Sequence, residues 1–460
     1  TNRWLRNTDE VVGPHSVSLY LQIMSGEDDI VNHNMRCTRI DSQNNVQKHE
    51  VISKTLPGTS GWIWSDHTLA IYQNAQAFVE AGIKQHNSRI FLTRLFLKPC
   101  VVVADNQALL ELLTEKEDHY EAGMDEYYDL FGDNLLFMNG PEATLTRKLL
   151  YPLFNEESKS GYKAITKDLV ETWISELDAS KPFNVYESTK HFALLLNLRL
   201  YLGLDHNKEP QLVEQFSSVA TTHWHGMCSL PVNIKVPGLK SGFGQGVDAK
   251  DELLLLLREP FLVNMSESIP SEELQLNHLL VCCCAIIPKV FASVLTSFIL
   301  MAPSWKPYYQ TCSSEEEKEA ALDKILLEVM RLLPPTTGGR RVARRDTQLK
   351  GYAIPSGMVV HFSFFGAHTD PAVFPEPNKF RPERWVEENK NDRCRMFAFG
   401  AGPRECIGKK MIWDIILIFC KAFVHKFEWE VSGDHLKQLK FIPAVRPKKK
   451  PHIQLLTKLN

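Results

Sequence analysis

The sequence predicts a mainly α-helical fold with a minor β-sheet. Most of the chain places apolar residues at helical spacing. Runs with the alternation and β-branched residues of strands are short, and they include Arg89–Phe96, Cys100–Ala104 and Val359–Phe362. Hydrophobic residues make up 44% of the 460 residues and charged residues 23%, which is the composition of a packed globular protein.

Two regions divide the chain. Residues 1–55 are polar and irregular and carry no motif, so we expect an N-terminal extension of unknown role. Turn-forming residues from Leu56 to Trp62 mark the start of a large folded domain, which we expect over residues 56–460. No signal peptide or clear membrane anchor opens the chain at Thr1. The localisation therefore stays open: soluble as given, or membrane-associated if an anchor precedes this sequence.

The longest and most apolar of the expected helices is Glu272–Met301. Its length and composition resemble a membrane span, but Pro288 and Lys289 stand near its middle. Because a charge at that depth is costly in lipid, a buried core helix is the better interpretation. The two longer segments expected to be loops are Tyr127–Asn139 and Leu230–Gly246. The other expected helices are Phe78–Asn87, Gln107–Thr114, Thr144–Phe154, Tyr162–Leu177, Lys190–Leu202, Gln211–Met227, Leu253–Asn264, Glu315–Leu333 and Met411–Val424.

Charge and cysteine usage exclude several classes of protein. The formal net charge is −3, so nothing marks the whole chain as a nucleic-acid binder. Three of the ten cysteines are consecutive (282–284) and no CxxC framework occurs, which argues against a zinc site and a disulfide scaffold. His223 and His225 have a spacing seen in metal ligands, but such residues do not face each other on a helix. A substrate-access or surface role is the better interpretation for them.

A ten-residue stretch, Phe399–Gly408, carries the strongest chemical signal. Gly400, Gly402 and Gly408 permit a tight loop and a close approach of a flat ligand. Cys406 stands just before an apolar helix, whose N-terminal dipole favours a thiolate. Arg404 offers a forked donor to an anionic group. A thiolate on a glycine-rich loop beside an arginine is what a haem iron with an axial cysteine requires.

The spacing Phe-Gly-x-Gly-x-Arg-x-Cys-x-Gly resembles the haem-binding signature of the cytochrome P450 family. The resemblance implies the P450 fold, with haem b (iron protoporphyrin IX) between a long distal helix and the helix after the cysteine loop. It implies that Cys406 ligates the iron and that Phe399, Gly400 and Gly408 lie against the cofactor. The alternative is a buried structural cysteine near a turn.

Further motifs follow the order seen in that family. Glu328 and Arg331 stand three residues apart on one helix face, and the resemblance implies that Arg384 joins them in a buried structural triad. It also implies that Arg404 and Arg147 pair with the haem propionates, although Ala143 replaces the aromatic ring or histidine usual four residues before the arginine. His368 fits another family segment and is expected either to reach a propionate or to be structural.

The expected distal helix departs from the family pattern. Its relatives carry a Gly-rich motif with an acid and a threonine that relay protons to dioxygen. The stretch from Val281 to Val290 holds no Gly, Ser, Thr, Asp or Glu. Pro288 is expected to break the helical ladder there. Lys289 is a candidate substitute proton donor and hence a catalytic candidate, although a lysine in an apolar site would lose its charge or point outward.

Two segments are expected to line a substrate pocket together with Ala285 and Pro288 of the distal helix. Both are mainly apolar or small, which suits a lipophilic substrate. The first holds Thr336, Thr337 and Gly338, and the second holds Ile442 and Pro443. Within the family, the chain looks most like the branch that oxidises sterols, retinoids and other terpenoids.

The resemblance leaves three hypotheses for function. The preferred one is a monooxygenase-type oxidation of a lipophilic molecule such as a terpenoid, sterol or fatty acid. The second is rearrangement or cleavage of a hydroperoxide or endoperoxide, which needs no electron donor and tolerates the missing relay. The third is a haem protein that carries or senses a ligand without turnover. For the first, basic residues at 147, 148, 409 and 410 would form a surface for an acidic flavin or iron–sulfur electron donor, unless they are an ordinary solvated face. The sequence predicts no oligomeric state.

Overall fold

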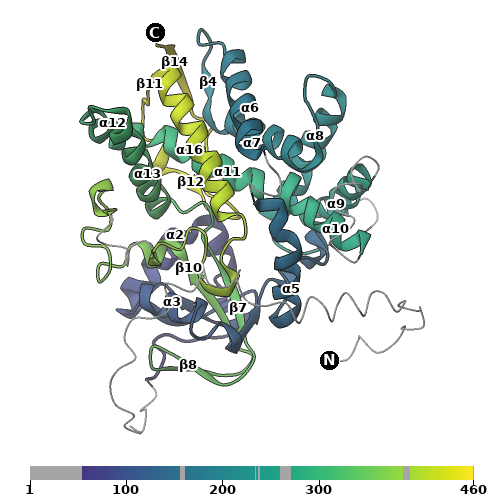
Figure 1. Cartoon of the computed structure of the whole chain (residues 1–460). Coiled ribbons are helices and arrows are strands. Elements are labelled where there is room, and N and C mark those ends of the chain that lie inside the picture. The colour runs from purple at the N-terminus through teal and green to yellow at the C-terminus, as the bar shows by residue number, and fades with distance from the viewer. Residues whose placement is uncertain are drawn as a thin grey trace, which may run out of the picture. The chain divides into compact units, whose positions relative to one another are not determined.

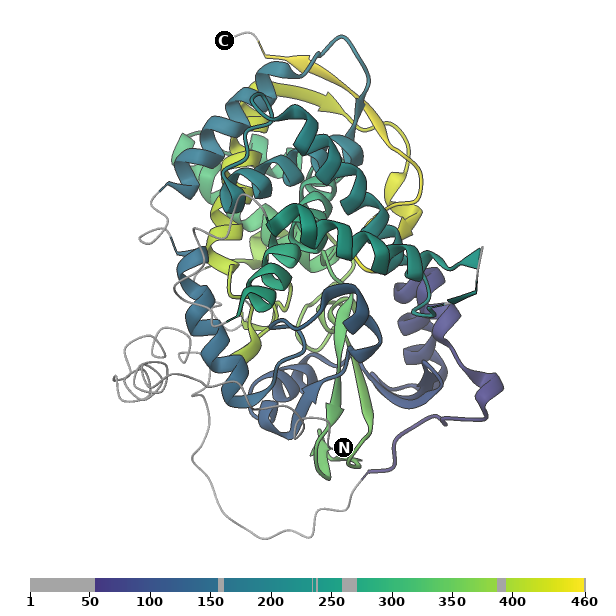
Figure 2. The ribbon, with the colours of Figure 1, turned by 90° about the vertical axis from the view of Figure 1, so that its right-hand side faces the viewer.

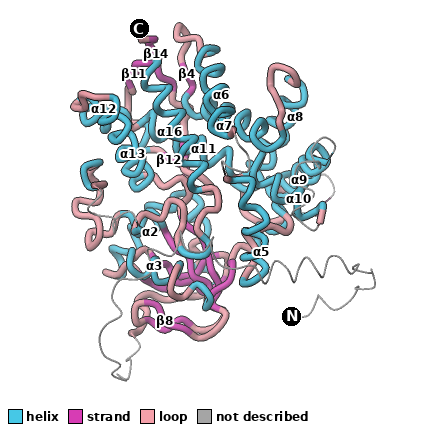
Figure 3. The backbone as a smooth tube through the Cα atoms, viewed as in Figure 1, coloured by secondary structure: helices cyan, strands magenta, loops and turns pink. Residues whose placement is uncertain are grey.

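The computed structural model describes residues 54–155, 161–233, 235–236, 239–258, 271–386 and 394–458 (Figure 1). The expected extension over residues 1–55 therefore lies almost wholly outside the described residues, and so does the end of the expected helix Leu253–Asn264. Helices dominate the described part, and strands form small sheets, which confirms the predicted fold class (Figure 3).

The helices agree with the expected ranges to within a few residues at most ends, although α2, α7 and α9 begin earlier. Three further short helices, α4, α12 and α14, were not expected from the spacing. The bounds are α2 Thr68–His86, α3 Asn106–Leu113, α4 Tyr128–Phe131, α5 Gly140–Leu150, α6 Tyr162–Glu176, α7 Val185–Leu202, α8 Pro210–Cys228, α9 Gly242–Arg258, α10 Glu272–Leu280, α11 Ile287–Leu300, α12 Ala302–Gln310, α13 Glu315–Leu332, α14 Phe364–His368 and α16 Lys409–Lys426.

A five-stranded sheet has the order β1-β2-β10-β7-β3. The predicted hairpin is its edge: Ile90 pairs with Val103 in an antiparallel register, and β10 then pairs parallel with β2. A second sheet has the order β11-β14-β4. The bounds are β1 Ile90–Leu95, β2 Lys98–Val103, β3 Tyr120–Ala122, β4 Phe183–Asn184, β5 Lys235–Val236, β6 Leu239–Lys240, β7 Gly338–Ala343, β8 Thr347–Leu349, β9 Tyr352–Ile354, β10 Val359–Ser363, β11 Phe427–Glu430, β12 Leu439–Lys440, β13 Arg446–Pro447 and β14 His452–Thr457.

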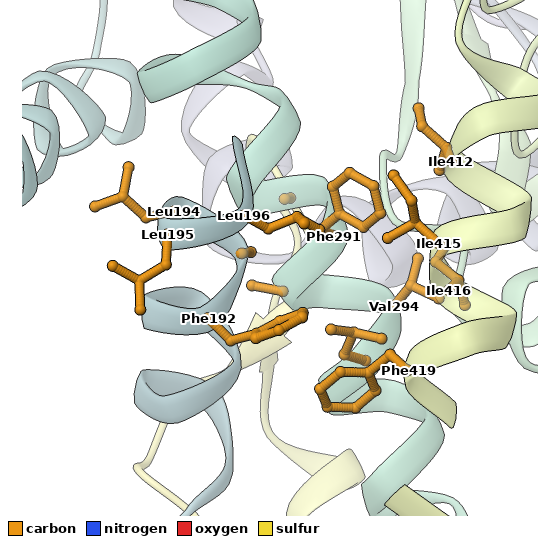
Figure 4. Close-up of a cluster of buried hydrophobic side chains, with 14 of the residues drawn as sticks. Phe192, Leu194, Leu195, Leu196, Phe291, Val294, Ile412, Ile415, Ile416 and Phe419 are labelled. Carbon is orange, nitrogen blue, oxygen red and sulfur yellow. The ribbon is translucent and has the colours of Figure 1, made fainter. Parts of the chain in front are cut away.

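The main hydrophobic core lies where α7, α11 and α16 meet. Figure 4 shows Phe192 from α7, Phe291 and Val294 from α11, and Phe419 from α16 pointing toward one another. Phe192 and Phe419 have ring centroids 4.9 Å apart. Burying each such ring contributes on the order of 2 kcal/mol. This core holds the distal helix at a fixed distance from the helix that follows the cysteine loop.

The predicted loop Leu230–Gly246 is wrong in its second half. α9 already begins at Gly242, and a β5–β6 hairpin precedes it. The glycines there serve helix packing rather than a loop, because a Cβ on Gly226 would lie 2.6 Å from the Cα of Gly246. α8 and α9 therefore touch backbone to backbone, side by side (Figure 2).

The distal helix is interrupted, as the proline predicted. α10 runs into a π-helical segment, Val281–Ala285, and α11 starts anew at Ile287. The N–H of Ile286 donates to the carbonyl of Val281 at 3.3 Å, which is the wide i to i+5 bond of a π turn. Pro288 follows in the first turn of α11, where its missing N–H costs nothing. Of the most apolar window in Glu272–Leu300, 78% is buried inside the protein, as a core helix requires.

Candidate functional site: the cysteine loop and the distal helix

The cysteine loop is held by its own backbone. The N–H of Cys406 donates to the carbonyl of Phe399 and the N–H of Gly400 donates to that of Phe397, both at 2.8 Å. Gly402 has φ +66° and a Cβ there would lie 2.1 Å from the carbonyl oxygen of Leu113, so only glycine fits. α16 begins three residues after the cysteine, at Lys409. The loop therefore presents Cys406 from a rigid turn.

Cys406 lies close enough to Cys282 of the distal helix for the two sulfur groups to interact electrostatically. Burial raises the pKa of its thiol, while the Gly408 N–H and the charge of Arg147 lower it. A metal ion at the sulfur would outweigh the burial cost, because a coordinated thiol is deprotonated. Burial, with the charge of Cys406, also raises the pKa of Cys282, in the π-helical segment, to about 12. A flat cofactor bound at Cys406 would therefore lie close to that segment.

The side chains of Cys282, Cys283 and Cys284 are all buried. They fill the core at the point where the distal helix changes its hydrogen-bond ladder.

Three arginines surround the loop. Arg147 of α5 donates to the carbonyl of Glu405, and burial lowers the pKa of its guanidinium. Arg404 forms an ion pair with Glu117, with Nε 2.9 Å from Oε1, and donates to Asn139. Arg341 of β7 was not predicted; burial and the neighbouring charge of Arg404 lower its pKa to about 10. Arg341 and Arg404 thus form a second cationic group, in which a bound carboxylate could compete with Glu117 for Arg404.

The structure brings Glu328, Arg331 and Arg384 together. The Glu328 and Arg331 side chains are fully buried; Nη2 of Arg331 lies 2.8 Å from Oε1 of Glu328. Nε of Arg384 lies 3.2 Å from the same oxygen. The Glu328 carboxylate also accepts from the Trp385 indole at 3.0 Å and from the Arg381 N–H at 2.9 Å. A buried charge with this many partners is satisfied, and removing one partner is costly.

His368 is buried and uses both ring nitrogens inside the protein. Nε2 accepts from the N–H of Phe397 at 2.7 Å, and Nδ1 lies 3.2 Å from the carbonyl of Arg331. Burial and the charge of Arg331 lower the pKa of its imidazole to about 3. This arrangement supports the structural role of His368 and leaves no ring nitrogen for a propionate. It joins the helix of the triad to the residue just before the cysteine loop.

Lys289 lies inside the protein, with 2% of its surface exposed. Burial, with the charge of Lys190, lowers its pKa to about 8. Its Nζ lies 5.8 Å from the centroid of the Trp224 ring. The residue therefore faces α8. Of the two outcomes expected for a buried lysine, the side chain does not point outward, and its lowered pKa lies in the direction of losing the charge.

The expected pocket segments meet near the distal helix. The N–H of Val445 donates to the carbonyl of Pro335 at 3.1 Å, which joins the segment of Ile442 and Pro443 to that of Thr336 and Thr337. β13, which follows directly, contacts α11. On the distal helix, Ala285 and Pro288 are buried. Gly338 opens β7 with φ +138°, and a Cβ there would collide with the carbonyl of Phe362.

Sequence reasoning missed some residues of this region and misplaced one. His223 is buried, not on the surface, and its Nε2 lies 2.8 Å from the carbonyl of Leu130. Trp224 and Arg446 are buried close to Lys289. These three residues are brought together only by the tertiary fold. The one local signal was that Arg446 closely follows the segment of Ile442 in the sequence. Across the described ranges no group of three or more His, Cys, Asp or Glu side chains could hold a metal ion.

The predicted basic residues of α5 and α16 lie at the surface. Lys148 and Lys410 are exposed, and Lys409 and Lys410 each pair with an acid one helical turn away, Glu405 and Asp414. The positive charge is thus partly compensated along α16.

The residues present fit a haem. The donor set is a single thiol on a backbone turn, apolar residues opposite it, and arginines at the rim that suit two carboxylates. A porphyrin with two propionates has this chemistry. Cys406 would hold the iron, and Arg147, Arg341 and Arg404 would be the cations for its propionates.

Comparisons with known proteins support this assignment of a haem site. Residues 316–455 match the model of the family "Cytochrome P450". The chain is 27% identical to "Putative cytochrome P450 120" of Synechocystis sp., over 87% of this chain and 96% of the relative. It is 25% identical to "Beta-amyrin 28-monooxygenase" of Medicago truncatula, over 77% of this chain and 82% of the relative. The structure of "Retinoic acid bound cyanobacterial CYP120A1" superimposes with a TM-score of 0.75 at 25% identity, over 88% of this chain and 100% of that one.

The relatives cover most of this chain, and the family model covers the cysteine loop and the triad. The chain is therefore similar to cytochrome P450s in sequence and in fold, and it is a haem-binding oxidoreductase of the monooxygenase type.

Proposed function

We propose that this protein oxidises a lipophilic small molecule of the retinoid or terpenoid kind at a haem ligated by Cys406. The observation that carries the proposal is the rigid cysteine turn that faces a buried, apolar distal segment. The relatives named for retinoic acid and β-amyrin support the substrate class. Haem with a thiolate ligand supplies electron density that favours O–O bond cleavage.

The residues of this chain have separate tasks in that reaction. Phe399, Gly400 and Gly408 form the turn against which the cofactor would lie, and Arg147 and Arg404, with Arg341, would neutralise its propionates. The apolar wall from Val281 to Pro288 excludes water from the reacting face. Lys289 is the one amine on this part of the distal helix, and a pKa of about 8 lets it hold or release a proton near neutral pH.

A second candidate function is rearrangement or cleavage of a lipid hydroperoxide. The specific observation in its favour is that no hydroxyl or carboxylate side chain stands between Val281 and Val290. Such a substrate brings its own O–O bond and needs neither an electron donor nor the usual proton relay. The exposed lysines of α5 and α16 favour the monooxygenase, because an acidic donor protein could use them.

Spectra and turnover separate these functions. The reduced protein with carbon monoxide should absorb at the position of thiolate-ligated haem, and a histidine-type band would refute Cys406 as the ligand. Turnover that requires a reductant and dioxygen supports the monooxygenase. Fast conversion of a fatty-acid hydroperoxide without reductant supports the rearrangement. Inertness under both conditions would leave a ligand carrier.

A further inference from the structure

Two buried cations lie against one tryptophan beside the expected substrate pocket. Lys289 of α11 is 2% exposed and Arg446 of β13 is 8% exposed. The Lys289 Nζ lies 5.8 Å from the centroid of the Trp224 ring, and the guanidinium carbon of Arg446 lies 5.4 Å from it. Trp224 of α8, Lys289 of α11 and Arg446 of β13 thus lie together in one buried, positively charged region, which we call the cationic place.

Neither cation has a carboxylate partner among the described residues. The Nζ of Lys289 makes no hydrogen bond or ion pair there and lies over the Trp224 ring. Arg446 donates only to neutral acceptors, the carbonyls of Ile442 and Ala444 at 2.8 Å and the sulfur of Cys228 at 3.1 Å. A buried charge without a counter-ion is costly, and proteins rarely keep one without a use.

The nearest acid is already engaged. The charge of Glu187 on α7 acts on Lys289, but its Oε2 lies 2.6 Å from the Nζ of Lys190, and Lys450 lies 3.7 Å from its other oxygen. Glu187 therefore already has two lysine partners, and its charge also acts on Lys289. The local balance favours an additional anion.

A free donor lies in the same place. The hydroxyl of Tyr186 on α7 is buried and has no hydrogen-bond partner within the described residues. Burial raises the pKa of this phenol, and the charge of Arg446 lowers it, so the hydroxyl is close enough to feel the guanidinium. A neutral phenol beside two cations is a donor set that suits a carboxylate.

The cationic place adjoins segments that are expected to line the substrate pocket. Arg446 is bonded to the carbonyl of Ile442, a predicted pocket residue, and Lys289 follows Pro288 on the distal helix. Lys289 stands seven residues, on the order of 10 Å along the helix, after Cys282, the distal residue that faces Cys406. An anionic head bound at Lys289 would therefore leave the reacting carbon several bonds away from the head.

We propose that Lys289 and Arg446, with the hydroxyl of Tyr186, bind the carboxylate of the substrate, so that this enzyme oxidises a lipophilic carboxylic acid at a carbon remote from its carboxyl group. This inference rests on the proposed function and narrows its substrate class. The retinoic acid of the similar cyanobacterial structure is a molecule of this kind, an isoprenoid chain that ends in a carboxylate. A neutral terpenoid would leave both cations without a partner.

Binding to the ferric holoprotein tests the proposal without turnover. The probes are all-trans-retinoic acid and arachidonic acid, each compared with its methyl ester, and the dissociation constant is read from the haem absorbance and from calorimetry. In the wild type at least one acid should bind about tenfold to a hundredfold more tightly than its ester, as expected for a charge-assisted contact. Lys289→Met and Arg446→Gln should remove this preference and leave the ester affinity within about twofold.

Two controls make the outcome decisive. Lys289→Arg should keep the preference for the acid, and Lys181→Met, which removes an exposed cation paired with Asp178, should change it little. The carbon monoxide spectrum of each variant reports whether the thiolate-ligated haem is intact, so a lost band would be a failure of the proposed function. An intact band with equal binding of every acid and its ester in the wild type, or an unchanged preference in Lys289→Met, would overturn the carboxylate site.

Discussion

Replacing Lys289 by methionine is expected to stabilise the ligand-free protein, by an amount that depends on pH. The ammonium group is buried and has no counter-ion within the described residues. Burial, with the charge of Lys190, lowers its pKa from 10.5 to about 8. Methionine fills most of the same space without the charge, so it removes the cost of burying the ion.

The magnitude follows from proton linkage. Between the two pKa values the unfolded chain binds the proton and the folded chain does not, so the stability of the wild type rises with pH across this window. The difference between the two pKa values corresponds to about 3 kcal/mol in the free energy of unfolding. The folded protein is less stable by this amount below about pH 8, and the loss disappears as the pH approaches the pKa of the unfolded chain. The advantage of methionine should therefore be about 3 kcal/mol near pH 7 and smaller by about 2 kcal/mol near pH 9.5.

Urea unfolding of the ferric, ligand-free protein, followed by circular dichroism at these two pH values, measures the difference. Lys181→Met is the matched control, because Lys181 is exposed and its replacement should leave the pH dependence of stability unchanged. An equal difference between the wild type and Lys289→Met at both pH values would refute the reasoning, since Lys289 would then have an ordinary pKa in the folded state.

Three further outcomes are expected. Cys406→Ser should abolish the thiolate band of the reduced carbon monoxide complex; persistence of that band would exclude Cys406 as the ligand. Glu328→Gln should destabilise the protein by about 3–5 kcal/mol, because it leaves buried arginines without their anion; Glu315→Gln, at an exposed pair, should not, and equal urea midpoints for the two variants would contradict this. Lys148→Glu with Lys410→Glu should slow reduction by an acidic donor protein at low salt more than at high salt, whereas a salt-independent rate would count against a donor surface on α5 and α16.

Local patterns carried most of what the sequence could predict. The turn around Cys406 and the pairing of Glu328 with Arg331 depend on residues a few positions apart, so spacing alone indicates them. The contact of Arg384 with Glu328 was expected only because the family resemblance implied it. In the glycine-rich stretch before α9, composition indicated a loop, because close contact between Gly226 and Gly246 cannot be seen without the partner helix.

The cationic place around Lys289 shows the other limit. Lys289 attracted attention for its position in an apolar helix, but Trp224 and Arg446 are 65 and 157 residues away in the chain. No periodicity links positions so far apart, and the charge balance of a buried region depends on every element that packs there. Such a site can be recognised only after the fold has brought its members together.

The imidazole of His368 has a mechanical consequence for the metal centre. Nδ1 bonds to the carbonyl of Arg331, and Nε2 accepts from the N–H of Phe397. A single side chain therefore links the last turn of α13 to the segment that leads into the cysteine loop. Any loosening of that turn would be transmitted to the iron–sulfur bond. The Soret absorbance of the haem protein should therefore change before the protein unfolds globally. It would report local unfolding at the end of α13, a region that does not contact the haem.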